Sequence, residues 1–356
     1  MENPSRREFI KQLLGIGAIS LFMPTNLFGF SKRSHIELIK KRVEYFHKKG
    51  KKRGGRVLII GGIHGNEIGA YKAADLLVDV EVKRGELFII PRSNFESILA
   101  DLRGYNGDMN RKFSHISKRD ADFYKVAFLK EAIKEIRPNV VLSLHDGYGF
   151  NIKNPRHWGQ SVVIDEKRYK YFNLYSIANY VLHHSNKYLY RYKLGLINTK
   201  TFSSTLHKEQ RNALTGWCLK NGIMAFCNES SKQLKLDDKI YTHLLMLREY
   251  FKLFSVEISP SIDYLIKHFK KLSPKHYYSA VLDINGRRYR FNHSSTIKIK
   301  KGSNIKVVSV NGGRGSYLVA KGVNLNWNSF HFRSHLNLVL KDDYKSIFKL
   351  KILQGV

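Results

Sequence analysis

The stretch RVLIIGGIHGNEIGA, residues 56–70, decides the fold. Its first half is a run of aliphatic and β-branched residues typical of a buried strand, and its second half leads into a helix that begins near Glu67. Gly61 and Gly62 lie between the two, where glycine allows the backbone to turn sharply. A strand that leads directly into a helix is the repeating unit of an α/β sheet.

The same alternation continues to about residue 254. Further strands are predicted at 86–91, 140–144, 161–164, 194–198 and 223–228, and helices at 67–78, 121–136, 171–184, 213–221 and 236–254. Residues 36–48 also have apolar residues at helical spacing, which predicts a helix that the Lys-, Arg- and Gly-rich residues 49–56 would end. We therefore expect a mostly parallel sheet flanked by helices over residues 35–254.

From about residue 275 the pattern changes to short alternating runs without helices. The predicted strands are 277–283, 287–291, 295–300, 304–310, 316–320, 335–340 and 344–352. The pairs Asn285-Gly286 and Asn311-Gly312 are typical of hairpin turns. The chain of 356 residues exceeds the size at which one core stops growing, so we expect a second, smaller all-β domain over residues 275–356.

Residues 1–31 have the features of a twin-arginine export signal. Arg6 and Arg7 precede a short apolar run at 13–23, which is too short to span a membrane comfortably. The alternative is an amphipathic first helix, and a signal that is not cleaved would leave the protein membrane-associated. Export by this route predicts a periplasmic protein that folds first, which suits a chain whose only cysteines are Cys218 and Cys227.

The charge is strongly basic. Lys and Arg number 62 against 29 Asp and Glu, for a formal net charge of +33, which favours contact with polyanions. The basic residues are spread along the chain without an aromatic-interleaved RNA-binding motif, and export also argues against nucleic acid. An anionic cell wall or membrane surface is the remaining partner, with an ordinary solvated basic surface as the alternative.

Three residues could hold a metal ion. His64 and Glu67 lie where the first strand ends and the helix begins, and ligands bind beyond the carboxyl ends of strands in such sheets. A catalytic zinc needs three protein ligands, and the best third candidate is His145, at the end of strand 140–144. A His and a Glu three residues apart also occur by chance on solvated helices, so the pair alone is weak evidence.

The ordered motifs resemble the zinc metallocarboxypeptidase family, which includes aspartoacylase-like and succinylglutamate desuccinylase-like deacylases. More closely, the chain is similar to the cell-shape-determining peptidoglycan D,L-carboxypeptidases, which trim tripeptide stems to dipeptides and carry β-rich domains after the peptidase. The resemblance covers roughly residues 55–253 and implies a mixed sheet flanked by helices with one Zn²⁺ per chain. It rests on four segments: His64-Gly65-Asn66-Glu67, Arg103 with Asp108-Met109-Asn110-Arg111, Leu144-His145-Asp146 and Cys227-Asn228-Glu229.

The resemblance also implies catalytic roles. Glu229 would be the general base that activates the zinc-bound water and passes the proton to the leaving amine. Arg103 would polarise the scissile carbonyl and stabilise the oxyanion. The alternative for Glu229 is a surface carboxylate at a helix N-terminus, and for Arg103 a solvated loop arginine.

Three further residues have roles by the same resemblance. Asn110 and Arg111 would bind the terminal carboxylate of the substrate, because a guanidinium matches a carboxylate with two hydrogen bonds. Asp108 would accept the outer ring N–H of a zinc histidine, with His64 as the expected partner. The alternative for Asp108 is an ordinary turn residue.

The first hypothesis is therefore a periplasmic zinc carboxypeptidase that releases diaminopimelate from peptidoglycan muropeptides and contributes to cell shape. The second is a zinc deacylase of small N-acyl amino acids, which would use the same motifs but is expected mainly in the cytoplasm. A third is a wall-binding scaffold without activity, against which the presence of all the motif residues argues.

Overall fold

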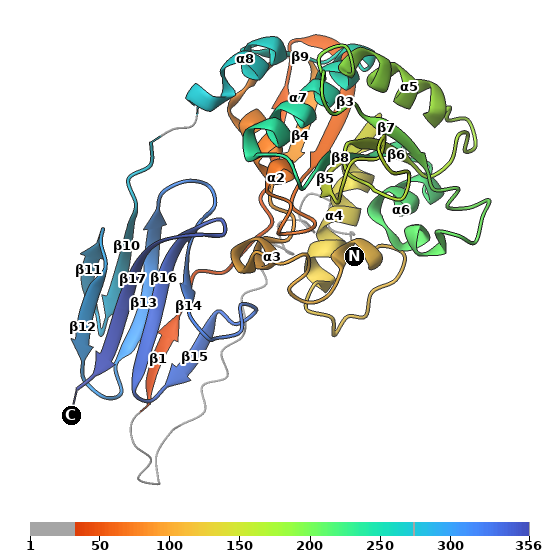
Figure 1. The fold of residues 1–356 in the computed structure, drawn as a ribbon. Coiled ribbons are helices and arrows are strands. Elements are labelled where there is room, and N and C mark those ends of the chain that lie inside the picture. The colour runs from red at the N-terminus through yellow and green to blue at the C-terminus, as the bar shows by residue number, and fades with distance from the viewer. Residues whose placement is uncertain (1–32, 273–274, 356) are drawn as a thin grey trace, which may run out of the picture.

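The computed structural model describes residues 33–272 and 275–355, which form an α/β domain and a β-sandwich (Figure 1). The predicted export signal at 1–31 lies outside the described residues. The α/β domain contains β2 (Phe46–Lys49), β3 (Lys52–Ile60), α2 (Ile68–Leu76), η1 (Leu77–Asp79), β4 (Glu81–Ile90), α3 (Phe95–Ala100), η2 (Met109–Arg111), α4 (Phe123–Ile136), β5 (Val140–Gly147), β6 (Ser161–Ile164), α5 (Leu174–Ser185), β7 (Gly195–Asn198), η3 (Lys208–Asn212), α6 (Leu214–Lys220), β8 (Ala225–Ser231), α7 (Leu236–Leu253), β9 (Glu257–Ser259) and α8 (Ile262–Leu272).

The central sheet is mixed and mostly parallel, as the sequence predicts. Within the described residues it has eight strands in the order β2-β4-β3-β5-β8-β6-β7, with β9 pairing with β4. Strands β4, β3, β5 and β8 are parallel, so the carboxyl ends of β3, β5 and β8 lie at one edge. Strand β6 runs antiparallel to β8 and parallel to β7. The end of β6 therefore points away from that edge.

Helices cover both faces of this sheet because alternate strand residues point to opposite sides. On one face, α2, α5, α7 and α8 bury strand residues such as Val57 and Leu142. On the other face, α4 and α6 pack on Leu58, Ile60 and Val141. Among the described helices, none is long and apolar enough to cross a membrane.

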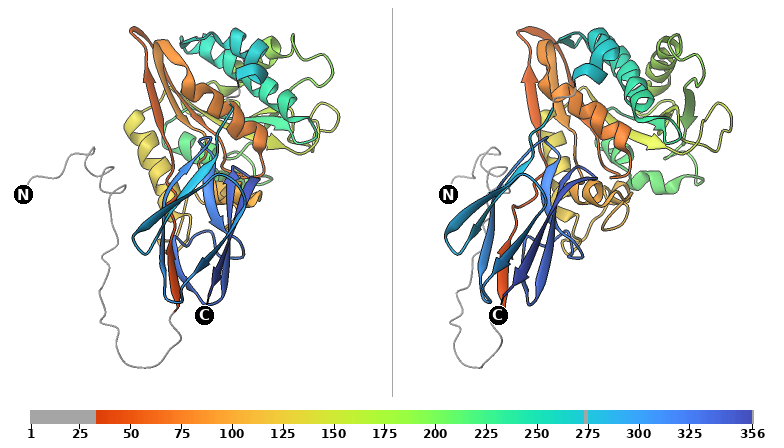
Figure 2. Two further views of the ribbon diagram at one scale, coloured as in Figure 1. Left: turned by 90° about the vertical axis from the view of Figure 1, so that its left-hand side faces the viewer. Right: turned by 60° about the vertical axis from the view of Figure 1, so that its left-hand side comes forward.

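The second domain packs two sheets face to face (Figure 2). One sheet has the order β11-β10-β13-β1-β15 and the other the order β12-β17-β16-β14. Their shared core is a separate apolar cluster that includes Ile36, Leu282 and Leu350. The strands are β1 (Ser34–Glu37), β10 (Ser279–Ile284), β11 (Arg287–Phe291), β12 (Ser295–Ile299), β13 (Asn304–Asn311), β14 (Ser316–Ala320), β15 (Ser329–Phe332), β16 (His335–Asp342) and β17 (Lys345–Gln354).

The predicted helix at 36–48 is wrong, because this segment contains parts of two strands, β1 and β2. Strand β1 pairs with β13 and β15 in the sandwich, while β2 pairs with β4. Ile36 and Leu38 are buried in or beside the sandwich core, and this tertiary burial outweighs a helical spacing of apolar residues. Two segments that are close in sequence thus belong to different domains.

One of the two predicted hairpins is also wrong. Asn285-Gly286 joins β10 to β11, which pair antiparallel, and both residues have the positive φ of 53° and 86° that such a turn requires. Asn311-Gly312 instead leads from β13 to β14, which lie in different sheets. The second pair therefore marks a crossing between the two sheets of the sandwich.

Candidate metal centre

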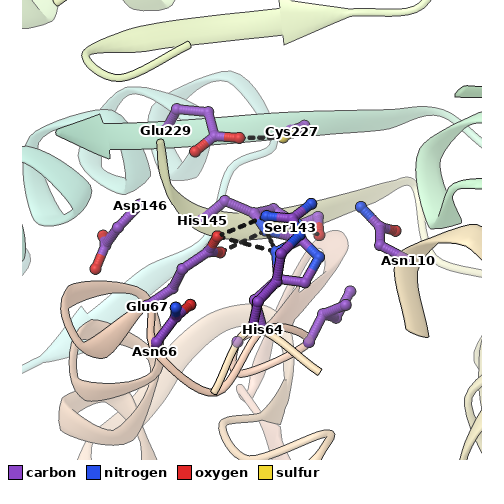
Figure 3. A network of polar contacts seen from close by, with 12 residues as sticks. His64, Asn66, Glu67, Asn110, Ser143, His145, Asp146, Cys227 and Glu229 are labelled. Atoms are coloured by element: carbon purple, nitrogen blue, oxygen red, sulfur yellow. Dashed lines mark hydrogen bonds and ion pairs between the residues drawn. The ribbon is translucent and has the colours of Figure 1, made fainter. Parts of the chain in front are cut away.

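His64, Glu67 and His145 meet in a buried cluster (Figure 3). The Nδ1 atoms of the two histidines lie 3.2 Å apart. Each also contacts one carboxylate oxygen of Glu67, at 2.9 Å from His64 and 2.8 Å from His145. All three side chains are at most 3% exposed, so their polar atoms face one another rather than solvent.

The strand ends bring these ligands together. Ile60 of β3 pairs with Ser143 of β5, so the residues that follow in each strand meet at the same edge. Between β3 and α2 the chain turns at Gly62, which has φ of +68°. A side chain at Gly65 would place its Cβ 2.0 Å from the backbone of Ser97, so only glycine fits next to His64.

The outer nitrogen of each histidine is held by a neighbouring side chain. His64 Nε2 lies 3.0 Å from Asp108 Oδ1, which is the contact that the resemblance implies for Asp108. His145 Nε2 lies 2.9 Å from the hydroxyl of Ser143, two residues earlier on the same face of β5. When each outer Nε2 carries the proton, both Nδ1 lone pairs face the cluster. Sequence reasoning missed Ser143, although its place two residues before a strand-end ligand is a usable signal.

This donor set fits a zinc ion. Two imidazole nitrogens and one carboxylate are the ligands of many catalytic zinc sites, and tetrahedral zinc–nitrogen bonds of about 2.0–2.1 Å place ligand atoms about 3.3 Å apart. The two Nδ1 atoms lie 3.2 Å apart, close to that value, and the two carboxylate oxygens lie slightly nearer, at 2.8 and 2.9 Å from the ring nitrogens. Burial alone would raise the pKa of Glu67, but His64 and His145 lower it well below its usual range. The carboxylate is therefore ionised and attracts a cation.

Glu229 lies on the strand next to His145. The two residues are register partners in β8 and β5, and Glu229 is 7% exposed. Its Oε1 lies 3.5 Å from the Cys227 thiol, while its Oε2 has no hydrogen-bond partner among the described residues. Burial, followed by the nearby charge of Glu67, raises the pKa of Glu229 well above its usual range. The carboxyl group is thus suited to hold a proton.

Arg103 lies beside the ligands. Its guanidinium contacts Asp108 Oδ2 at 3.0 Å and Glu67 Oε1 at 3.5 Å, and its side chain is 48% exposed. Arg103 therefore combines a fixed position at the cluster with access to solvent. This position agrees with a charge that stabilises an oxyanion, and not with a freely solvated loop arginine.

Asn110 and Arg111 line the same cavity as the metal ligands. Asn110 Oδ1 accepts a hydrogen bond from the backbone N–H of Leu214 at 3.0 Å, which leaves its side-chain amide protons for other partners. Arg111 Nη1 donates to the backbone carbonyl of Asn110 at 3.0 Å. The amide and the guanidinium thus form a paired donor surface that can bind a carboxylate.

Asp146, which the sequence left without a role, fixes the relative position of these elements. Its Oδ2 accepts a hydrogen bond from the backbone N–H of Gly69 in α2 at 2.7 Å. Its Oδ1 accepts from Ser230 of β8 at 2.5 Å and contacts His243 of α7 at 3.0 Å. One buried carboxylate therefore joins the segments that carry Glu67, His145 and Glu229.

The cavity of about 310 Å³ that contains these groups extends past them to Asp165. This residue is 4% exposed and accepts a hydrogen bond from the Thr201 hydroxyl at 2.5 Å. Burial raises the pKa of Asp165 to about 6, although Thr201 and Thr215 act in the opposite direction. Sequence reasoning missed this residue, even though it directly follows the correctly predicted strand 161–164.

Comparisons with known proteins agree with this geometry. Residues 21–273 match the family described as the catalytic part of a carboxypeptidase controlling helical cell shape. No curated protein matches the sequence significantly.

Solved structures of the cell shape determinant Csd4 from Helicobacter pylori share the fold. The product-bound form has a TM-score of 0.66 at 23% identity, over 87% of this chain and 76% of the other. The mDAP-bound form, described as a D,L-carboxypeptidase, has a TM-score of 0.64 at 23% identity over the same shares. The tripeptide-bound form has a TM-score of 0.58 at 17% identity, over 88% of this chain and all of the other. With well over half of its residues matched, this chain belongs to the family of carboxypeptidases that control helical cell shape.

Proposed function

We propose that this protein is a zinc carboxypeptidase that removes the terminal diaminopimelate from peptidoglycan tripeptides. The observation that carries the proposal is a single cavity lined by four features. They are the His-Glu-His cluster, the carboxylate oxygen of Glu229 that has no partner within residues 33–272 and 275–355, the paired donors Asn110 and Arg111, and the buried Asp165. Csd4 structures with a tripeptide or mDAP bound support this class of substrate.

Recognition of a chain end would come from Asn110 and Arg111. An amide and a guanidinium on adjacent residues can donate several hydrogen bonds to the two oxygens of a terminal carboxylate. Their position in the cavity with the metal ligands would place the last peptide bond of the stem near His64, Glu67 and His145. An endopeptidase would have no use for such a pair.

Hydrolysis would use Glu229 and Arg103. Zinc, when bound by His64, Glu67 and His145, supplies Lewis-acid polarisation of the scissile carbonyl and a lowered water pKa. The positive charge of zinc in this cluster would favour the ionised form of Glu229. The carboxylate would accept the proton of the attacking water at Oε2 and deliver it to the amine nitrogen as the carbon–nitrogen bond breaks. Arg103 would stabilise the negative charge that develops on the carbonyl oxygen.

Asp165 supports diaminopimelate rather than an apolar terminal residue. A buried carboxylate at the inner end of the cavity favours a positive group on the substrate side chain, and diaminopimelate carries a second ammonium group at the end of its side chain. A hydrophobic side chain would leave the ionised carboxylate buried and uncompensated. The terminal residue is therefore expected to carry an ammonium group at its far end, as diaminopimelate does beside its second carboxylate.

Location outside the cytoplasm is part of the proposal. The twin-arginine pattern at Arg6 and Arg7 supports export to the periplasm, and the net charge of +33 supports contact with an anionic wall or membrane surface. Fusion of residues 1–35 to a reporter that is active only after folded export would test this. The control is the same fusion with Arg6 and Arg7 replaced by Lys. We expect this control to show no reporter activity outside the cytoplasm.

Digestion of purified muropeptides tests the reaction. Tripeptide, tetrapeptide and pentapeptide stems are offered separately to the wild type, to Glu229→Gln and to the exposed-surface control Glu257→Gln, and the products are read by mass. We expect diaminopimelate only from tripeptides, with the wild type and Glu257→Gln active and Glu229→Gln slower by about a hundredfold or more. Release of aspartate or glutamate from N-acyl amino acids, without action on muropeptides, would instead support the deacylase.

A further inference from the structure

The Arg103 loop, residues 101–108, carries two groups of the site. Within its own domain Asn106 is held by Asp122 Oδ1 at 3.0 Å and by Lys112, whose Nζ donates to the Asn106 carbonyl at 2.8 Å. Leu102 N donates to the Ser97 carbonyl at 3.0 Å, and Tyr105 N donates to the Ser97 hydroxyl at 2.8 Å. Arg103 contacts Glu67, and Asp108 contacts His64. A displacement of this loop would therefore disturb both the proposed oxyanion charge and the orientation of one metal ligand.

The β-sandwich contacts this loop directly. Asn106 and Asn326 form a reciprocal side-chain amide pair, with N···O distances of 2.8 and 3.2 Å. The backbone N–H of Leu325 donates to the Tyr105 hydroxyl at 3.0 Å. Both sandwich residues lie between β14 and β15. These contacts come from the other domain, more than 200 residues away in sequence.

The helix before the loop packs on the same domain. Leu99 of α3 forms an apolar cluster with Tyr317, Val319 and Val339 of the sandwich, and Phe95 and Leu325 pack against it. Lys341 donates a hydrogen bond to the Leu99 carbonyl at the end of α3. In Figure 1, α3 lies at the junction of the two domains. Helix α3, which leads into the Arg103 loop, thus packs against the sandwich.

A buried ion cluster fixes the orientation of the two domains. Arg92, which follows β4, donates to Asp343 of the sandwich at 2.6 Å and to Asp75 of α2 at 2.7 Å. Lys72 contacts Asp343 at 2.6 Å, and Arg314 of the sandwich contacts Asp75 at 2.8 Å. Arg92 and Asp343 are at most 4% exposed, and a buried pair of this kind tolerates little movement.

From these contacts we infer that the β-sandwich is a positioning element of the catalytic site. Its Leu325–Asn326 segment holds the Arg103 loop in place, while the Arg92 cluster keeps the sandwich at a fixed angle. Asn326 and Leu325 act through the loop and do not touch substrate. The kinetic part of this inference rests on the proposed function, whereas the effect on the loop does not.

Hydrogen exchange of the full-length protein tests the inference. Exchange of the backbone amides of residues 101–108 is measured by mass spectrometry for the wild type, Asn326→Ala and Asn106→Ala. The matched control is Asn292→Ala, an exposed asparagine of the same domain away from the loop. Loss of the amide pair is expected to speed exchange of this segment about three- to tenfold in the first two variants and not in the control.

Kinetics on muropeptides provide the second reading. Asn326→Ala should raise KM or lower kcat by a similar factor at full zinc occupancy. The Asn106→Ala/Asn326→Ala double variant should add little to Asn106→Ala alone, because that single variant already removes the amide pair together with the contact of Asn106 with Asp122. Unchanged exchange over residues 101–108 in Asn326→Ala would overturn the inference. If even the wild type cleaves no stem peptide while exchange still rises, the proposed function fails and the role of the sandwich stands.

Discussion

The two ends of the cavity differ in how their polar groups are paired. At the metal end, side chains of the protein hold the Nε2 atoms of both zinc-ligand histidines. At the inner end, the Asp165 carboxylate has no basic partner among the described residues. Asp108 and Ser143 hold His64 and His145 at the metal end, but around Asp165 the recorded partners are neutral hydroxyl groups. The first arrangement is built to orient ligands in advance. The second leaves a charge to be matched by whatever binds.

Removal of one metal ligand should have the largest effect, on both zinc binding and the rate of hydrolysis. His145→Ala leaves one histidine and one carboxylate, too few to hold a catalytic zinc, so metal content should fall from about one zinc per chain to near zero. Hydrolysis of the tripeptide stem should drop at least about a thousandfold, because polarisation of the carbonyl is lost. Elemental analysis measures the zinc content, and mass spectrometry of the products measures hydrolysis. His183→Ala, at an exposed histidine of α5, is the control, and full zinc occupancy in His145→Ala would contradict the ligand assignment.

A neutral side chain at the inner end should change specificity rather than chemistry. Asp165→Asn removes the charge that would pair with the ammonium group of diaminopimelate, so kcat/KM for such tripeptides should fall about ten- to hundredfold. Tripeptides that end in alanine should be affected much less. The comparison of the two substrates is the measurement, and an equal loss on both would mean that Asp165 has no role in recognition.

The same residue should make stability depend on pH. The pKa of Asp165 in the folded protein is raised to about 6 from 3.8, so the folded state favours the protonated form more than the unfolded state does. Stability is therefore lost as pH rises from about 4 to about 6, by about 3 kcal/mol. The free energy of unfolding can be measured with denaturant at pH 4 and pH 7. Relative to the wild type, Asp165→Asn should be more stable at pH 7 than at pH 4. A stability difference that is the same at both values would contradict this.

The smallest effect is expected from the hydroxyl that holds His145. Ser143→Ala removes the partner of Nε2 while leaving all three ligands, so zinc affinity should weaken about tenfold. Competition with a chelator measures it. Ser185→Ala is a matched control because its hydroxyl is also buried but has no partner among the described residues. Equal affinity in both variants would show that the Ser143 contact does not orient the ring.

The sequence was informative where strands end at a common edge. His64 follows β3 and His145 lies near the carboxyl end of β5, and because these strands are parallel, the rule for carboxyl ends of strands brought the two residues together before any geometry was known. The same rule could not place Asp165. It follows β6, which runs antiparallel to β8, and strand direction in a mixed sheet depends on pairing that no local pattern records.

Contacts between distant segments account for the other differences. Residues 36–48 have an apolar spacing that fits a helix, but the partners of β1 in β13 and β15 lie about 270 and 300 residues later in the chain. Ser143 and Asp146 were visible beside His145, yet their roles depend on which atoms of other elements come within hydrogen-bond distance. Local periodicity contains no information of this kind.

The position of β1 also determines the order in which the chain can fold. In its sheet, β13 and β15 are joined only through β1, so the first described strand to leave the ribosome is an inner strand of the domain that is made last. The sandwich cannot close until synthesis is almost complete, and β1 must stay unpaired until then. A fragment of residues 275–355 would lack this inner strand. Separate production of the sandwich would therefore need a β1 segment supplied as a fusion or as a peptide.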